Sequence, residues 1–339
     1  MTSIPLVARG KVDHLPKSTV PPPDVPTLTG RVAKAAVMAQ KLVHEKPLRA
    51  VCFYPTEACN LRCPWCNAYG RPLKVLELER ALKFFRDGRL LGLRTVNFTG
   101  GGEPTLHPDF AQMVRDAHDN GLETSLVTNG TRLDAVPIGV LGSMTWIRVS
   151  INAGPRLYRV IHGAEEYNNA LWGVDRISRL AHVKKSVSVV WSRANTVDDL
   201  AELLRDLRGR GLHHVRIAPE IYAHQGVPDV DIPVAAIRGA ASRLELDYRL
   251  VIEHPRFIGV PAVCYTQWHK PVVDSDGLIY PCTINRTPLC SIEELARFWA
   301  AKMDHVDTRD QCTWCHFGDV NAMLNEYAAA EKAVDLAFL

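Results

Sequence analysis

Hydrophobic and polar positions along this chain follow two alternating periods, one typical of strands and one typical of helices. Short apolar runs are each followed by a longer stretch in which apolar residues recur at helical spacing, as in KVLELERALKFFRDG and HPDFAQMVRDAHDNG. The expected strands are residues 49–54, 95–100, 123–129, 146–152, 186–192 and 214–220. Strand-then-helix repeats predict a parallel sheet with helices on its outer face, since parallel strands need crossover connections.

Six such repeats predict an α/β fold organised as a partial (β/α)6 barrel, because a closed barrel of this kind needs eight units. Functional groups in such barrels lie at the C-terminal ends of the strands. A cysteine-rich loop directly follows the first expected strand, and a run of glycines ends the second. We therefore expect the chemistry of this protein at that edge of the sheet.

The pattern changes on both sides of the repeats. Residues 1–28 are rich in proline and lack a period, which predicts an extended or disordered arm, and residues 30–45 show helical spacing. After about residue 255 the helical repeats thin out into a loop-rich stretch with several cysteines, followed by a C-terminal helix in NAMLNEYAAAEKAVDLAFL. The expected parts are an arm with a leading helix at 1–48, a barrel at 49–254, and a small metal-binding domain at 255–339.

Composition narrows the classes of function. The 339 residues carry a formal net charge of +3, which gives no reason to expect nucleic acid or an anionic membrane as a partner. The N-terminal residues contain no apolar signal-peptide core, and no apolar run is long enough to span a bilayer, so we expect a cytoplasmic protein. Nine cysteines in a reducing compartment indicate metal ligands rather than disulfides.

The first cysteine group lies in the segment EACNLRCPWCNAYG, where Cys59, Cys63 and Cys66 form the pattern C-x3-C-x2-C. Three thiolates in one loop can bind three irons of a [4Fe–4S] cluster and leave the fourth iron open to another ligand. Structural zinc needs four ligands, usually from two C-x2-C pairs, and fits this spacing poorly. A cluster with an open iron is therefore the favoured interpretation.

This motif, placed after the first strand of a βα repeat and carrying an aromatic residue before its last cysteine, resembles the radical S-adenosylmethionine (SAM) superfamily. The resemblance implies that the open iron binds SAM and that an electron from a donor such as flavodoxin or ferredoxin cleaves SAM to a 5′-deoxyadenosyl radical. It also implies that Trp65 lies near the SAM adenine, whereas packing within the loop is the simpler interpretation of that residue.

The segment TGGGEP at the end of the second strand resembles the GGE motif of the same family. There the motif holds the methionyl amino group of SAM, which implies that role for Gly101, Gly102 and Glu103. Consecutive glycines alone are common in turns, but they also let the backbone approach a ligand closely. Their position one strand after the cysteine loop favours the family interpretation.

Two later strands end in segments similar to family segments that contact SAM. Ser150 and Asn152 share one face of the fourth strand and are expected at the ribose, although Asp is common where this chain has Asn152. Ser192 and Arg193 end the fifth strand, and the planar guanidinium suits a forked contact with the methionyl carboxylate. A surface ion pair is an equally good interpretation of Arg193.

A second cysteine group lies in the C-terminal part, where Cys264 and Cys282 flank the hairpin sequence VVDSDGLIYP and Cys312 and Cys315 form a C-x2-C pair. Four thiolates can bind zinc or a complete [4Fe–4S] cluster. The pattern resembles the Twitch domain, a shortened SPASM domain, which implies one auxiliary [4Fe–4S] cluster on these four cysteines.

Two cysteines lie outside both groups. Cys52 falls within the first strand and is expected to be a small buried hydrophobic residue. Cys290 is compatible with an inert thiol, a substitute cluster ligand, or a catalytic donor of a hydrogen atom to a substrate radical.

The resemblance implies an enzyme that abstracts a hydrogen atom from its substrate. The cysteine pattern of this chain is similar to that of the aminocyclitol dehydrogenase of butirosin biosynthesis and related natural-product enzymes. Fewer than sixty residues precede Cys59, which leaves little room for the peptide-binding domain of peptide-modifying relatives. We therefore expect a small polar metabolite (a sugar, aminocyclitol or nucleoside) that undergoes oxidation, dehydration, decarboxylation or epimerisation. Candidate substrate contacts at the end of the sixth strand are Glu220 and Tyr222, for which a structural role is an equally good interpretation.

Two alternatives remain open from the sequence. The chain is also compatible with a radical SAM enzyme that crosslinks or epimerises ribosomal peptides. The second alternative is a non-catalytic binding protein whose fold is stabilised by a bound metal.

Overall fold

The computed structural model describes residues 38–66, 68, 70, 72–220, 231–253, 260–301, 312, 315 and 317–333. Within them a ten-stranded sheet has the order β10-β9-β8-β1-β2-β3-β4-β5-β6-β7. Its parallel strands are β1 (Ala50–Phe53), β2 (Thr95–Phe98), β3 (Glu123–Thr128), β4 (Trp146–Ser150), β5 (Lys184–Trp191), β6 (His214–Pro219) and β7 (Arg249–Ile252). The predicted α/β fold with a parallel sheet is confirmed.

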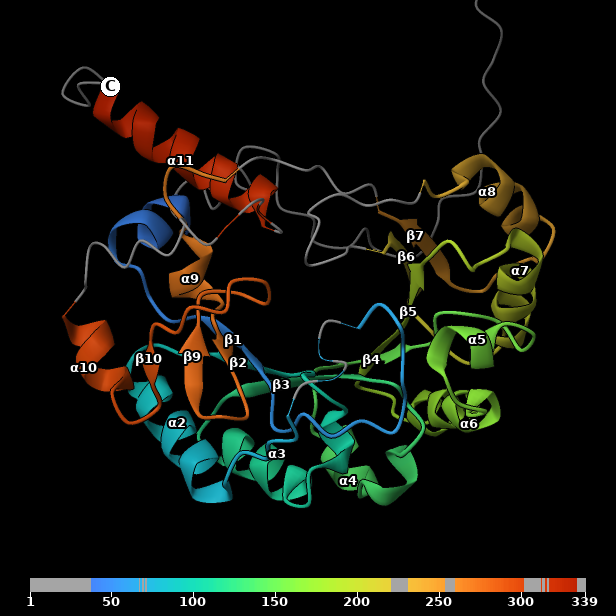
Figure 1. Ribbon diagram of the computed structural model, residues 1–339, viewed down its shortest axis with the longest axis horizontal. Helices are drawn as coiled ribbons and strands as arrows, with labels where there is room; N and C mark the ends of the chain where they lie inside the picture. The colour runs from blue at the N-terminus through green and yellow to red at the C-terminus, as the bar shows by residue number, and fades with distance from the viewer. Residues whose placement is uncertain are drawn as a thin grey trace, which may run out of the picture.

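Helices follow the strands and lie along the outer face of the curved sheet (Figure 1). They are α2 (Leu78–Leu90), α3 (Phe110–Asp119), α4 (Ile138–Gly142), α5 (Tyr158–His162), α6 (Tyr167–Ser178), α7 (Val197–Asp206) and α8 (Val234–Ser242). Short 3-10 turns, η1 (Pro104–Leu106) and η2 (Leu133–Ala135), follow β2 and β3. None of the helices in the described residues is long and apolar enough to cross a bilayer.

The core lies between the sheet and these helices. Phe53 on β1 packs against Phe84 and Phe85 of α2, with ring centroids 5.8 Å and 5.2 Å away. On β4, Ile147 and Val149 are fully buried on this side, whereas the alternate residues Trp146, Arg148 and Ser150 are only half-buried. Period-two alternation therefore leaves the inner face of the sheet partly open.

All six predicted strands are present, but β7 was missed because its sequence, RLVI, is short and half-exposed and gives only a weak apolar signal. The leading helix is confirmed for residues 38–44, and the C-terminal helix is observed as α11 (Gly318–Ala333). The proposed arm at 1–28 lies outside the described residues.

The C-terminal part extends the barrel sheet. The predicted hairpin is observed as β8 (Val272–Val273) and β9 (Leu278–Tyr280), and β10 (Cys290–Ser291) pairs antiparallel with β9. Strand β8 also pairs in parallel with β1, which extends the sheet beyond β1. Two helices, α9 (Thr266–His269) and α10 (Leu295–Ala300), accompany the hairpin. The predicted division at residue 254 stays a prediction, and the sheet itself runs across it.

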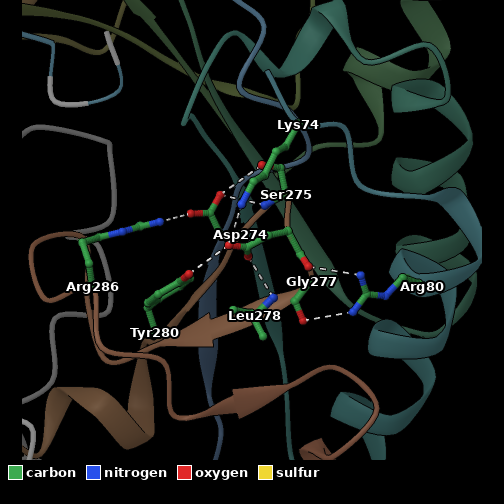
Figure 2. Close-up of polar contacts among 9 residues, drawn as sticks. Lys74, Arg80, Asp274, Ser275, Gly277, Leu278, Tyr280 and Arg286 are labelled. Atoms are coloured by element: carbon green, nitrogen blue, oxygen red, sulfur yellow. Dashed lines mark hydrogen bonds and ion pairs between the residues drawn. The ribbon is translucent and has the colours of Figure 1, made fainter. Parts of the chain in front are cut away.

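The turn between β8 and β9 docks on helix α2 and on the segment after the first cysteine loop (Figure 2). Arg80 of α2 donates from Nη1 to the carbonyl oxygen of Asp276 at 3.1 Å and from Nη2 to that of Gly277 at 3.4 Å. Lys74 forms an ion pair with the Asp276 carboxylate at 3.3 Å. The hairpin is therefore fixed to the first βα unit by its turn as well as by strand pairing.

Candidate active site

The loops that the sequence singled out meet at one edge of the sheet. They follow the C-terminal ends of the parallel strands β1 to β5, as expected for this architecture. Cys59, Cys63 and Cys66 line one cavity of about 190 Å³, together with Glu57 and Gly101. The structure thus brings the predicted cysteine and glycine motifs together.

The glycine loop (residues 99–104) lies close to the cysteine loop (residues 59–66), because its glycines carry no side chains. The backbone N–H of Gly102 donates to the carbonyl oxygen of Thr56 at 2.8 Å, and that of Glu103 donates to Ala58 at 2.8 Å. A methyl group on Gly102 would lie 2.1 Å from the Ala58 carbonyl oxygen. Such a contact is far inside van der Waals range, so this position requires glycine.

The three thiols of the first group open towards the cavity: Cys59 and Cys66 are exposed, and Cys63 is half-buried. The Cys59 sulfur accepts a hydrogen bond from the backbone N–H of Leu61 at 3.4 Å. Burial raises the pKa of Cys63 to about 12, and the neighbouring thiols Cys66 and Cys59 add to this effect. A coordinated thiol is deprotonated, so a metal bound at Cys63 would oppose this rise in pKa.

This donor set fits an iron–sulfur cluster better than a single ion. Among the described residues, no three His, Cys, Asp or Glu side chains converge closely enough to hold one metal ion. The ligands of a cluster bind separate irons and so stand further apart than the ligands of one ion. The sulfur atoms of Cys59 and Cys63 each have a hydrogen-bonding neighbour, the Leu61 N–H and the His162 ring, as expected around cluster sulfur.

Glu103 is buried, and its carboxylate accepts four hydrogen bonds from the protein. Its Oε1 accepts from the backbone N–H and the hydroxyl of Thr105 and from the hydroxyl of Thr128, and its Oε2 accepts from the Asn129 backbone N–H at 2.7 Å. Burial raises the pKa of Glu103, and these hydrogen bonds oppose the rise. The carboxylate orders the ends of β2 and β3, and its predicted contact with SAM stays a prediction.

Asn129 connects the end of β3 to the cysteine loop. Its Nδ2 donates to Asn60 Oδ1 at 2.9 Å, and Asn60 donates in turn to the Thr131 hydroxyl at 2.8 Å. Sequence reasoning assigned no role to Asn129, although it ends the third expected strand at 123–129. Its position after a strand of the repeat was the available signal.

His162, at the end of α5, is a site residue that sequence reasoning missed. Its Nδ1 lies 3.4 Å from the Cys63 sulfur, and its Nε2 accepts the backbone N–H of Asn152 at 3.0 Å. Burial lowers the pKa of His162 to about 3, so the ring is neutral. Trp65 is half-buried, with its ring 6.4 Å from that of His162. A lone histidine in RVIHG carries no spacing signal that would have identified it.

The predicted SAM contacts on β4 and β5 lie close together. The Asn152 side-chain oxygen accepts the Val190 N–H at 2.9 Å, and Ser192 donates through its hydroxyl to Asn195 at 2.8 Å. Asn195, which the sequence did not indicate, also donates to the Asn152 carbonyl oxygen at 2.6 Å. These contacts tie the two strand ends together, and the roles towards SAM stay predictions.

The remaining predicted contacts differ in exposure. The Ser150 hydroxyl lies 3.3 Å from that of Ser188, and Arg193 is exposed. Glu220 is 2% exposed at the end of β6, whereas Tyr222 lies outside the described residues.

Two asparagines join the segments of the second cysteine group. Asn285 donates its backbone N–H to the Cys282 sulfur at 3.3 Å and its side-chain Nδ2 to Cys312 at 3.4 Å. Asn321 of α11 donates to the Cys315 sulfur at 3.3 Å. Sequence reasoning missed both residues.

Asn321 also reaches the segment that carries Cys264. Its side-chain oxygen accepts the backbone N–H groups of Tyr265 and Thr266 at 2.8 Å and 3.2 Å. Burial raises the pKa of Cys282 to about 11, and the Cys264 and Cys312 thiols raise it further. Asn285 and Asn321 therefore link the chain segments that carry the four predicted ligands.

The loop after Cys282 is anchored to the hairpin. Asp274 is 1% exposed and forms an ion pair with Arg286, whose guanidinium lies 4.1 Å from the ring centroid of Tyr280 (Figure 2). A buried carboxylate paired in this way fixes the start of the loop relative to the β8 strand end.

The two remaining cysteines are buried. Cys52 packs with Tyr54, Val272 and Tyr280, which confirms it as a small buried residue of β1. Cys290 lies in the main hydrophobic core, and burial raises its pKa to about 12. Its surroundings favour the inert interpretation, and its other two roles stay predictions.

Curated proteins with similar sequences include two GTP 3′,8-cyclases. GTP 3′,8-cyclase of Actinobacillus pleuropneumoniae serotype 3 (strain JL03) is 31% identical over 161 residues, which cover 44% of this chain and 46% of the relative. GTP 3′,8-cyclase of Photorhabdus laumondii subsp. laumondii is 25% identical over 293 residues, covering 83% of each chain. The chain thus spans about half the length of the first of these curated relatives.

Solved structures show a similar fold. Streptococcus suis SuiB bound to its precursor peptide SuiA has a TM-score of 0.61 at 16% identity, covering 85% of this chain and 73% of SuiB. The anSMEcpe enzyme with bound AdoMet and a Cp18Cys peptide has a TM-score of 0.58 at 12% identity, covering 79% of this chain and 82% of that one. At these identities the likeness concerns the fold alone.

The model of the radical SAM superfamily matches residues 53–231, which are 179 of the 339 residues and include the first cysteine loop and the ends of β2 to β6. The chain therefore belongs to the radical SAM superfamily, whose enzymes use SAM and a [4Fe–4S] cluster.

Proposed function

We propose that Cys59, Cys63 and Cys66 hold the [4Fe–4S] cluster of this enzyme and that it abstracts a hydrogen atom from a small polar metabolite. One observation carries the proposal: all three cysteines line a single cavity at the C-terminal edge of the sheet, beside Gly101. When bound, the cluster and SAM supply a 5′-deoxyadenosyl radical by reductive cleavage of SAM.

We assign the SAM contacts to the loops that meet around this cavity. The methionyl amino group of SAM would lie at Gly101, Gly102 and Glu103. Among the described residues, Glu103 Oε2 accepts one hydrogen bond, from the Asn129 N–H, and a carboxylate oxygen can accept a second. The further contacts are Ser150 and Asn152 for the ribose, Ser192 and Arg193 for the carboxylate, and Trp65 for the adenine.

The inner face of the sheet favours a polar substrate. Across β4, β5 and β6, Arg148 lies beside Ser186, and Ser188 lies between Ser150 and Arg216. Arg216 is paired with Glu253, and burial lowers the pKa of Arg148 to about 10, with Arg216 adding to this effect. Hydroxyl groups and guanidinium groups suit a substrate rich in hydroxyls or anionic groups.

The curated relatives suggest where to begin. They are named for an activity on GTP, so a purine nucleoside triphosphate is the first candidate within the class of sugars, aminocyclitols and nucleosides. Aminocyclitols are the second group of substrates to test, and they would place the enzyme in natural-product biosynthesis.

We further propose that Cys264, Cys282, Cys312 and Cys315 hold an auxiliary [4Fe–4S] cluster of the Twitch type. The hydrogen bonds of Asn285 and Asn321 to three of these cysteines support one shared site. Four cysteines leave no iron open, so such a cluster would exchange electrons rather than bind substrate. A zinc ion is the competing occupant.

The test is anaerobic reconstitution of the full chain with iron and sulfide, followed by measurement of 5′-deoxyadenosine under reductant. We expect the wild type and Cys52→Ala to produce it and Cys63→Ala to lose it. A well-loaded wild type that cleaves no SAM would disprove the enzymatic proposal. Transfer of deuterium from labelled GTP or labelled aminocyclitols into 5′-deoxyadenosine then identifies the substrate class.

A further inference from the structure

The ring of His162 bridges a cysteine of the first group and the end of β4. Its Nε2 accepts the Asn152 backbone N–H at 3.0 Å, and its Nδ1 lies 3.4 Å from the Cys63 sulfur. A backbone N–H can only donate, so Nε2 is the unprotonated nitrogen. The neutral ring therefore carries its hydrogen on Nδ1, directed at the sulfur.

The ring is held in this orientation from several sides. His162 is 1% exposed, and its ring stacks on that of Tyr158 with centroids 4.1 Å apart. The His162 carbonyl oxygen accepts the backbone N–H of Arg62, the residue before Cys63, at 2.9 Å. A methyl group on Gly163 would lie 2.9 Å from the Arg62 carbonyl oxygen, so the end of α5 and the cysteine loop are in close contact.

We propose that His162 is a positioning residue that raises the reduction potential of the [4Fe–4S] cluster by donating its Nδ1–H to the Cys63 sulfur. Reduction adds one negative charge to a cluster, and a hydrogen bond to a ligating sulfur stabilises that charge. The same ring fixes the backbone at Asn152, so it links the cluster to a strand end assigned to SAM. This inference rests on the proposed cluster at Cys59, Cys63 and Cys66.

Two substitutions separate the two nitrogens of the ring. In His162→Asn the amide nitrogen takes approximately the place of Nδ1 and keeps a donor for Cys63, whereas in His162→Gln the amide takes approximately the place of Nε2 and removes that donor. A purely structural role predicts that both variants retain the wild-type potential whenever they load iron.

The measurement is a potentiometric titration of the reconstituted full-length proteins, following the EPR signal that changes when SAM is added. We expect His162→Gln to lower the ratio of reduced to oxidised cluster about tenfold at a fixed potential, which is about 59 mV for a one-electron couple. His162→Asn should remain near the wild-type value, as should His118→Gln, a control on the exposed His118 of α3. A wild-type potential in iron-loaded His162→Gln would overturn the inference.

A second measurement needs no folded variant. Wild-type protein labelled with [15N]histidine should show a nitrogen coupling to the reduced cluster in pulsed EPR, because His162 donates to a ligating sulfur. Absence of that coupling in loaded protein would also overturn the inference. Failure of the wild type to load iron would instead refute the cluster assignment itself, so the two failures are distinct.

Discussion

Gly102 shows how a single residue controls the shape of the cavity. Its backbone N–H donates to Thr56, and an added methyl group would lie 2.1 Å from the carbonyl oxygen of Ala58. The added methyl group would meet backbone atoms, which cannot rotate away as the end of a long side chain can. The clash is removed only if one of the two loops moves. Cys59 directly follows Ala58, so the movement would displace a proposed cluster ligand.

We therefore expect Gly102→Ala to retain less iron after reconstitution and to form 5′-deoxyadenosine roughly tenfold more slowly, the equivalent of about 1.4 kcal/mol. Gly139→Ala in α4 is the matched control, because a methyl group there meets nothing within 4 Å. Iron analysis and product formation are measured on both. Equal behaviour of the two variants would show that the glycine and cysteine loops are not coupled.

Residue types and spacing predicted some parts of the site and not others. Cys59, Cys63 and Cys66 were identifiable because thiols at short, fixed spacing have few other uses in a reducing compartment. His162 and Asn321 were not, because isolated polar residues on helices show no pattern until folding brings them to a sulfur atom.

The same distinction holds for whole elements. Apolar runs predicted strands β1 to β6, since each buries one face against helices. The parallel pairing of β8 with β1 was not predictable, because a hydrophobic period identifies a strand but not its neighbour in the sheet. Residues Cys52 and Val272, paired across these strands, are 220 positions apart in the sequence, by the difference of their numbers.

The turn between β8 and β9 provides a test of how the hairpin docks. Gly277 has a φ of +77°, and an added methyl group would lie 2.1 Å from the Arg80 guanidinium. Gly209 has nearly the same φ, +76°, with nothing within 4 Å. The two positions share the left-handed backbone and differ in the contact with Arg80.

We expect Gly209→Ala to reduce the free energy of unfolding by about 1 kcal/mol, from backbone strain alone. Gly277→Ala should lose about 1 kcal/mol more, because the displaced guanidinium gives up its hydrogen bonds to Asp276 and Gly277. Urea unfolding measures both losses. In an Arg80→Ala background the extra loss should disappear, and its persistence would rule out the proposed contact as the cause.

At the scale of the whole molecule, one continuous sheet holds both cysteine groups. Strand β1 leads into the loop with Cys59, and its neighbour β8 begins the hairpin that ends before Cys282. Strand pairing and the Arg80 contacts at the turn therefore fix the relative positions of the two proposed clusters. A fixed arrangement suits transfer of an electron from a substrate radical to the second cluster, because neither site has to move.

This arrangement predicts separable roles for the two cysteine groups, which the double variant Cys312→Ser/Cys315→Ser tests. Its iron content should fall from about eight to about four atoms per chain, as expected for loss of one [4Fe–4S] cluster. Cleavage of SAM should continue, because the first group is intact, while oxidised product from the deuterated substrate should be lost. Cys290→Ala should change neither iron content nor turnover, since Cys290 lies in the hydrophobic core. Zinc in the wild-type protein, lost together with Cys312 and Cys315 while turnover persists, would contradict an electron-accepting role for this part of the chain.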